Sequence, residues 1–417
     1  MYLLPYYGKS GQIYYVGSLV SKEAKGGEGS VHCLPQNPGL VAKIYRCDVL
    51  SANDIKQRAR KVESMLTKNS PLASSDSFCA WPQDALYDSD GVFCGYIMRS
   101  VEQGVKLSRK LSDKLRIQST QEELIAIACN LAIAVEQVHS HSYVIGDFKP
   151  DNLLVDSHAF ITIIDVDSFQ FEFKDEFFPC KAGTPEWLPP ELQETSFACH
   201  SFSAETDRWA LAVIIFKLLM NDTHPFTHRM TNPLAERSSQ SENVICGLSS
   251  HFPETNRAGL AIGEPLTCPP LSTLPPEVCN LFRQTFVDGH IADLRRPAAV
   301  EWITPLQQLS QRLIVCSVDV KHIYWEQVTS CPWCAVKRAS RVPLTIEPPT
   351  STAPKNKAPR QNPIQQGTSP YFNDIQYRNT QPKDASIETF LTAVGIGLAI
   401  VGAFVLIFLL LVVLLGV

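Results

Sequence analysis

The chain has 417 residues, 45% of them hydrophobic, and a formal net charge of -5. This length allows two or three domains, and the apolar content is enough for a sizeable core. The negative charge argues against bulk electrostatic attraction to nucleic acid, so we expect no nucleic-acid partner. The 13 cysteines are mostly scattered through apolar segments, as in a reducing compartment, and the first residues lack the basic start and continuous apolar core of a secretory signal.

A glycine-rich turn, KGGEGSV, lies near the start of the chain, contains Gly26 and Gly29, and ends at Val31. Glycines lack the side chains that would keep backbone N–H groups away from phosphate oxygens, although an ordinary hairpin turn would also explain them. The β-branched run VAKIY at residues 41–45 then predicts a strand that carries Lys43.

Apolar residues at helical spacing predict a helix over residues 53–66. This helix carries Glu63, which we expect to form an ion pair with Lys43. A solvated helix face would also explain Glu63, because it lies in a charged run.

The most informative segment is IGDFKPDN, residues 145–152, which is followed by DVD at residues 165–167. The runs LLV and FITII, which lie between these two segments, predict two short strands. We therefore expect both segments to lie at strand ends that face one cleft. Phosphoryl transfer needs a carboxylate to orient the attacking hydroxyl, a cation near the phosphate, and oxygen ligands for magnesium. Asp147 fits the first role, Lys149 the second, and Asn152 and Asp165 together fit the third.

Three later segments complete the pattern. The sequence GTPEWLPPE at residues 183–191 is typical of the end of an activation segment, and DRWAL at residues 207–211 predicts the start of a buried helix. Further on, Arg296 lies in an RRPAA motif and is expected to pair with Glu191.

With these elements in order, residues 10–308 resemble the eukaryotic-like protein kinase superfamily, in a divergent branch typical of bacteria. The resemblance implies an α+β, two-lobed kinase fold, with an N-lobe over residues 10–99 and a C-lobe over residues 100–308. It also implies that Lys149 marks a kinase of protein serine or threonine residues. ATP would be held by Gly26, Gly29, Val31, Lys43 and Glu63, and magnesium by Asn152 and Asp165.

Three positions depart from the family's motifs. Ala24 replaces the first glycine of the glycine-rich loop, and Gly146 replaces the arginine before the catalytic aspartate. Without that arginine we expect no receptor for a phosphate on the activation segment, so phosphorylation there should not switch activity. Asp167 replaces the last glycine of the usual DFG motif, where it could add a metal ligand or bond to nearby backbone.

The segment 312–338 contains Cys316, His322, Cys331 and Cys334 in the spacing C-x5-H-x8-C-x2-C. Three thiolates and one imidazole suit a tetrahedral zinc ion, and so short a segment otherwise lacks a core. A redox-active CxxC with an unrelated histidine is the alternative.

The end of the chain changes in composition. Residues 339–387 are rich in Pro, Gln, Asn, Thr and Ser, which predicts a disordered linker. Residues 390–417 contain no charge and exceed the roughly 20 residues that cross a bilayer, so they predict one transmembrane helix. A removable tail for a lipid anchor would need prior export, for which no signal is evident.

The sequence therefore predicts an ATP-dependent serine/threonine protein kinase, tail-anchored in a membrane with its kinase domain in the cytoplasm. The alternative is a membrane-tethered pseudokinase that binds partner proteins as a scaffold. The complete set of catalytic residues argues against it, whereas the altered DFG motif favours it. A small-molecule kinase is disfavoured by the activation segment, which resembles a peptide-docking platform.

Overall fold

The computed structural model describes residues 4–339, except for 22–23, 69–71, 73–77, 102–103, 113–117, 198–199 and 232–237, and also the backbone of residues 362–363. All of these residues belong to one of the two units into which the chain divides, Met1–Tyr371.

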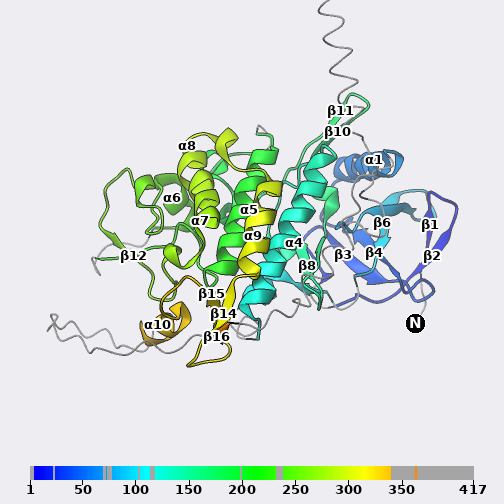
Figure 1. Ribbon diagram of the computed structural model, residues 1–417. Coiled ribbons are helices and arrows are strands. Elements are labelled where there is room, and N and C mark those ends of the chain that lie inside the picture. The colour runs from blue at the N-terminus through cyan, green and yellow to red at the C-terminus, as the bar shows by residue number, and fades with distance from the viewer. Residues whose placement is uncertain are drawn as a thin grey trace, which may run out of the picture. The chain divides into compact units, whose positions relative to one another are not determined.

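The N-terminal part is a six-stranded sheet in the order β2-β1-β5-β6-β4-β3, with antiparallel neighbours throughout. Figure 1 shows this sheet in blue and cyan beside helix α1. Its first strand lies before residue 10, so the sheet begins earlier than the expected N-lobe. The strands are β1 (Leu4–Gly8), β2 (Ile13–Val16), β3 (Gly29–Cys33), β4 (Leu40–Tyr45), β5 (Pro82–Tyr87) and β6 (Phe93–Arg99).

Strand β4 has two differently covered faces because successive side chains of a strand point in opposite directions. Val41 and Tyr45 join one apolar cluster, which also contains residues of α1, and Ala42 joins another on the opposite face. Lys43 therefore lies on the same face of the sheet as α1. The predicted strand at residues 41–45 is confirmed.

Helix α1 (Ala52–Thr67) confirms the helix predicted over residues 53–66. Ser51 caps it: its side chain accepts a hydrogen bond from the backbone N–H of Asp54, whose carboxylate accepts one from the N–H of Ser51. The buried residues Ile55 and Val62 fix which face of α1 packs on the sheet.

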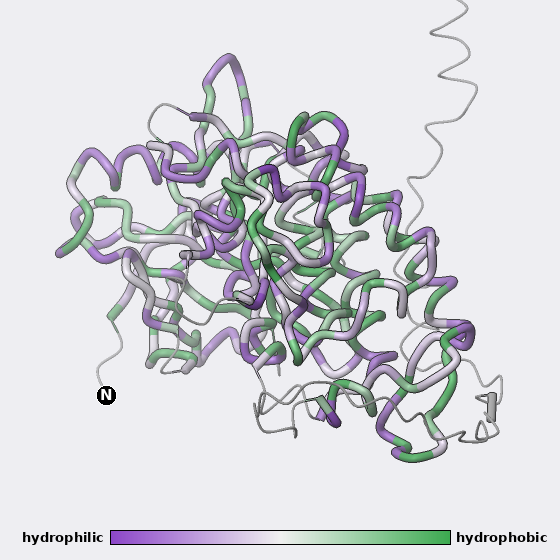
Figure 2. Tube along the Cα trace, turned by 90° about the vertical axis from the view of Figure 1, so that its left-hand side faces the viewer, coloured by the Kyte–Doolittle hydropathy of each residue, from purple (hydrophilic) through white to green (hydrophobic). Residues whose placement is uncertain are grey.

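The C-terminal part is mainly helical. Helix α4 packs against both α5 and α9, which run beside it in the middle of Figure 1. Nearly every residue of α5 from Trp209 onward is buried, as expected for a helix that is hydrophobic on all sides. Figure 2 shows many hydrophobic segments in the middle of the trace. The helices are α2 (Leu107–Leu111), α4 (Gln121–Ser140), α5 (Ala204–Leu219), α6 (Gln240–Cys246), α7 (Pro276–Arg283), α8 (Gly289–Ile291) and α9 (Ala299–Ser310).

Short strands accompany these helices. The sheet β7-β8-β9 contains the two strands predicted around residues 153–155 and 160–164. The strands are β7 (Val105–Lys106), β8 (Leu153–Val155), β9 (Ile161–Ile163), β10 (Phe171–Phe173), β11 (Glu176–Phe178), β12 (Arg229–Met230) and β13 (Ile262–Gly263).

The ion pair predicted between Glu191 and Arg296 is confirmed. The guanidinium donates two hydrogen bonds of 2.8 Å to the two carboxylate oxygens and also bonds to the backbone oxygen of Gly289. Arg296 is only 2% exposed, whereas the side chain of Glu191 is 41% exposed, so this fork ties the segment 183–191 at the surface to a buried arginine of the helical core.

The cysteine-rich segment packs on this helical part, since β15 contacts α4. It contains β14 (Leu313–Val315), β15 (Ile323–Trp325) and α10 (Pro332–Ala339), and β16 (Asn362–Pro363) pairs with β14. The rest of the predicted linker beyond Ala339, and the predicted transmembrane segment 390–417, lie outside the described residues. Within the part of the chain that is described, no helix is long and apolar enough to cross a membrane.

His224 links the segment 183–191 to the helical core. Its Nδ1 accepts a hydrogen bond from the backbone N–H of Phe226, so the proton lies on Nε2, which donates to the backbone oxygen of Glu186 at 3.0 Å. Burial, aided by the charge of Lys217, lowers the pKa of His224 from 6.5 to about 3. The folded protein therefore holds this histidine neutral.

This lowered pKa predicts a loss of stability in acid. Below pH 6.5 the unfolded chain takes up a proton on His224 that the folded chain does not, so the free energy of unfolding falls as the pH is lowered toward 3. His224→Gln should lose this dependence, and its stability relative to the wild type should improve by about 2 kcal/mol between pH 7 and pH 5 in urea unfolding. Parallel stability profiles would contradict this, and the exposed His158→Gln serves as the control.

Candidate active site

The loop before β8 gathers the residues predicted for catalysis. Lys149 Nζ lies 2.5 Å from one oxygen of Asp147, and the hydroxyl of Thr184 donates to the other at 3.0 Å. Lys149 also donates to the Thr184 hydroxyl at 3.0 Å. Asn152 donates to the backbone oxygen of Asp147, which closes the loop on itself. The structure thus brings Asp147, Lys149 and Asn152 together and adds Thr184.

A buried carboxylate beneath this loop holds its backbone. Asp207, at the start of α5, accepts hydrogen bonds from the N–H groups of Ile145 at 2.7 Å and Gly146 at 3.0 Å. Nε2 of His139 lies 2.9 Å from the same carboxylate. Asp207 is 1% exposed, and its three partners satisfy it where water cannot reach.

Gly146 occupies a position that excludes a side chain. Its φ is +78°, which favours glycine, and an added Cβ would lie 2.5 Å from Sγ of Cys180. The place next to Asp147 is therefore filled by the buried Cys180 side chain.

Asp165 lies two residues after the end of β9. The backbone N–H of Ile164 donates to the backbone oxygen of Asn152 at 2.9 Å, which holds the end of β9 against the Asp147 loop. Asp165 has a left-handed backbone with φ 65°. Its side chain is 39% exposed and contacts the amine of Lys43, so both predicted groups lie at the same end of β8 and β9.

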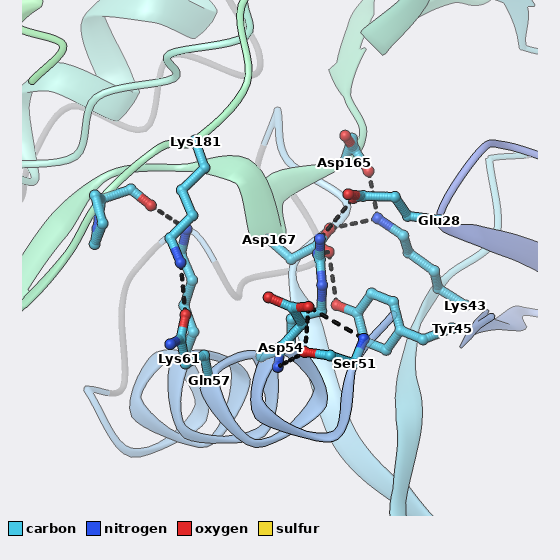
Figure 3. A network of polar contacts seen from close by, with 12 residues as sticks. Glu28, Lys43, Tyr45, Ser51, Asp54, Gln57, Lys61, Asp165, Asp167 and Lys181 are labelled. Carbon is cyan, nitrogen blue, oxygen red and sulfur yellow. Dashed lines mark hydrogen bonds and ion pairs between the residues drawn. The ribbon is translucent and has the colours of Figure 1, made fainter. Parts of the chain in front are cut away.

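Lys43 extends from β4 to two carboxylates of the DVD motif, as Figure 3 shows. It contacts Asp165 and lies 2.6 Å from Asp167. Burial alone would lower the pKa of this lysine, but the two carboxylates outweigh burial and raise it. Lys43 is therefore charged in the folded protein.

Asp167 is the most heavily bonded carboxylate of the site. It accepts hydrogen bonds from the hydroxyls of Tyr45 at 2.6 Å and Tyr96 at 2.9 Å, in addition to its contact with Lys43. Arg58 of α1 lies 3.5 Å away. Burial would raise the pKa of this carboxyl, but Lys43 and its other partners hold it below the ordinary value.

The ion pair predicted between Lys43 and Glu63 does not form in this structure. Glu63 instead accepts a hydrogen bond from Tyr87 and pairs with Lys9 at 3.0 Å. The reason is the rotation of α1: Arg58 faces the DVD motif, and five residues of an α-helix turn the chain by about 140° relative to it. Glu63 therefore points toward β1 and β5.

The glycine-rich turn lies over the same region. The N–H of Gly26 donates to the backbone oxygen of Gly29 at 2.8 Å, and Val31 pairs in register with Lys43. A Cβ at Gly29 would lie 3.0 Å from the backbone oxygen of Ile44 and 3.7 Å from Cε of Lys43. Glycine at this position allows β3 to approach the lysine closely.

Three residues have roles in this site that the sequence alone does not predict: Arg58, Thr184 and Asp167, which contacts Lys43. Asp167 departs from the family's glycine, and this departure is the sequence signal for its role. Arg58 lies in the same charged run as Glu63, and nothing in the sequence shows which of the two faces the DVD motif. Thr184 was visible only as part of the GTPEW motif.

The cysteine-rich segment brings four potential metal ligands together. The ligand atoms of Cys316, His322, Cys331 and Cys334 all lie within 4.8 Å of one another, a spacing that could hold a metal ion. The Sγ atoms of Cys316 and Cys334 are 3.7 Å apart, and Nδ1 of His322 is 3.4 Å from Cys334 Sγ.

The surroundings of these four residues also suit a metal. Backbone N–H groups of Val318 and Cys334 donate to the sulfurs of Cys316 and Cys331 at 3.3 and 3.5 Å. Asp319 lies 3.6 Å from Nε2 of His322, which leaves Nδ1 to face the sulfurs. Such outer contacts orient metal ligands in proteins.

Comparison with known proteins finds one family model and several similar proteins. A family model described as protein kinase domain matches residues 87–283. Protein kinase YegI of Escherichia coli K12 is 30% identical over 325 residues, and that of strain O157:H7 is 30% identical over 321; each match covers 75% of this chain. The chain spans about half the length of these relatives, 47% and 48%.

A further relative is the ovarian-specific serine/threonine-protein kinase Lok of Drosophila melanogaster. It is 27% identical over 177 residues, which are 42% of this chain and 36% of Lok. Together with the arrangement of Asp147, Lys149 and Asp165, these matches show that the chain belongs to the protein kinase superfamily.

Proposed function

We propose that the chain transfers a phosphoryl group from ATP to serine or threonine side chains of proteins. The observation that carries this proposal is the cluster in which Lys149 and Thr184 both contact the Asp147 carboxylate, on the loop that is hydrogen-bonded to the end of β9. Lys149 and the similarity to Lok, whose name states serine/threonine kinase, support the choice of hydroxyl substrates.

Each residue has a defined task in this proposal. Asp147 accepts the hydrogen bond of the attacking hydroxyl and so orients it, while Lys149 offers positive charge to the phosphoryl in transit. Lys43 contacts the nucleotide phosphates, which approach the backbone at Gly26 and Gly29. Asn152 and Asp165 would hold magnesium, which neutralises the charge of the phosphates when it is bound. The half-exposed Asp165 carboxylate has room for such a ligand.

Replacing the aspartate that orients the hydroxyl should remove most activity. With labelled ATP, magnesium and a protein substrate, Asp147→Asn should lower the rate at least about 100-fold, the usual contribution of a positioned general base. The matched control is Asp151→Asn, because Asp151 is an exposed residue of the same loop. Analysis of the labelled residues should find phosphoserine or phosphothreonine.

Two outcomes of that assay would contradict the proposal. Full activity in Asp147→Asn would show that another residue orients the hydroxyl. A wild-type chain that binds ATP but transfers no phosphate would favour the pseudokinase scaffold.

We further propose that Cys316, His322, Cys331 and Cys334 bind structural zinc. Tetrahedral Zn–S bonds of about 2.3 Å place two sulfurs roughly 3.8 Å apart, close to the separation of Cys316 and Cys334, 3.7 Å. Purified protein should therefore carry close to one equivalent of zinc, and Cys331→Ser should lose it and unfold locally. The exposed Cys246→Ser should keep the metal. Absence of zinc from wild-type protein purified without chelator would refute this site.

Membrane anchoring through residues 390–417 is also part of the proposal, and it is supported by the uncharged composition of that segment. Deleting residues 388–417 should release an active kinase into the soluble fraction, because the deletion leaves every residue of the active site in place. If the shortened chain stayed in the membrane fraction after high-salt washing, or if protease added outside intact cells digested the kinase region of the full chain, this topology would be wrong.

A further inference from the structure

We propose that Asp167, and not a glutamate of α1, positions the nucleotide-binding Lys43, and that Arg58 couples α1 and the glycine-rich turn to the same carboxylate. This inference rests on the proposed function, because it assigns how the lysine of that site is held. It makes Asp167 and Arg58 positioning residues.

The bonds of Asp167 divide between its two oxygens. Oδ1 receives Lys43 at 2.6 Å and the hydroxyl of Tyr96 at 2.9 Å, and Oδ2 receives the hydroxyl of Tyr45 at 2.6 Å and Arg58 at 3.5 Å. The side chain is 4% exposed. A buried carboxylate with both oxygens committed to protein donors has little capacity left for a metal ion.

Asp165 differs from Asp167 in all of these respects. It is 39% exposed and contacts Lys43 alone among the protein partners found for its side chain in the described residues. The two aspartates of the DVD motif therefore divide the work. Asp165 is left accessible for magnesium, whereas Asp167 holds the lysine from the protein side.

The side chain that α1 presents to the DVD motif is a cation, whereas the sequence predicts an anion there. Instead of a carboxylate that reaches Lys43, the helix presents Arg58, which reaches Asp167 and also forms a 2.6 Å ion pair with Glu28 of the glycine-rich turn. The guanidinium lies 5.0 Å from the centre of the Tyr45 ring, a cation–π distance. A helix cation cannot pair with a lysine directly, so the buried Asp167 is needed between them.

This geometry links three elements at one point. Lys43 comes from β4, Arg58 from α1 and Glu28 from the turn before β3, and each is joined to Asp167 directly or through one partner. Figure 3 shows Glu28, Lys43 and Tyr45 gathered around Asp167. A displacement of α1 would therefore move Arg58, shift the Asp167 carboxylate, and so change the position of Lys43.

A double-mutant cycle between Arg58 and Asp167 tests the coupling. In the full chain, Asp167→Asn keeps the size of the side chain but removes its charge, and it should lower kcat/KM for ATP at least tenfold while the KM for the protein substrate stays within twofold. Arg58→Met should lower kcat/KM for ATP about fivefold in the wild-type background and less than twofold beside Asp167→Asn. Independent structural damage at the two positions would instead give additive losses.

Two further variants sharpen this test. Asp175→Asn makes the same substitution in the exposed β10–β11 turn and should behave as wild type. Glu63→Gln should have a smaller effect than Asp167→Asn; the reverse ranking would assign the lysine to Glu63 and overturn the proposal. Additive losses in the cycle would overturn the part played by Arg58.

Amide hydrogen exchange separates failure of this inference from failure of the proposed function. Exchange in residues 52–67 should be faster in Asp167→Asn than in the wild type and unchanged in Asp175→Asn, whether or not the chain transfers phosphate. Unchanged exchange in Asp167→Asn would overturn the coupling of α1 to Asp167. Faster exchange in a chain without transferase activity would reject the proposed function alone.

Discussion

A carboxylate can be buried at Asp167 only because two cations and two hydroxyls, from three elements, satisfy it. Without them, taking the charge out of water would cost several kcal/mol. Lys43 and Tyr45 come from β4, Tyr96 from β6 and Arg58 from α1, so the position of each element depends on the same group. The N-terminal sheet and the loop after β9 are consequently held together at the point where the proposed nucleotide site lies.

Buried charges organise the rest of the site in the same way. Asp207 fixes the backbone of the Asp147 loop, and the fork between Glu191 and Arg296 fixes the end of the activation segment. Asp207 and Arg296 both have their hydrogen-bonding groups paired, so each specifies one local arrangement of the chain around it. Removing Glu191 would leave the buried Arg296 without its counter-charge, which is far more costly than losing an exposed ion pair.

Elements set by local pattern could be predicted from the sequence. The helix over residues 53–66 and the strands near Lys43, Leu153 and Ile161 follow from apolar spacing, and the pairing of Glu191 with Arg296 followed from family motifs. The partner of Lys43 could not be predicted. Apolar spacing shows which face of a helix is buried, but the choice between Arg58 and Glu63 depends on a rotation set by tertiary packing, and the family's pattern favoured the wrong residue.

The most direct test of a nucleotide site built around Lys43 and Asp165 is calorimetric titration of the full chain with ATP, in the presence and absence of magnesium. The arrangement predicts saturable binding that requires magnesium and weakens at least tenfold, about 1.4 kcal/mol, in Asp165→Ala. ATP binding that is absent, or that is equally strong without magnesium, would contradict it.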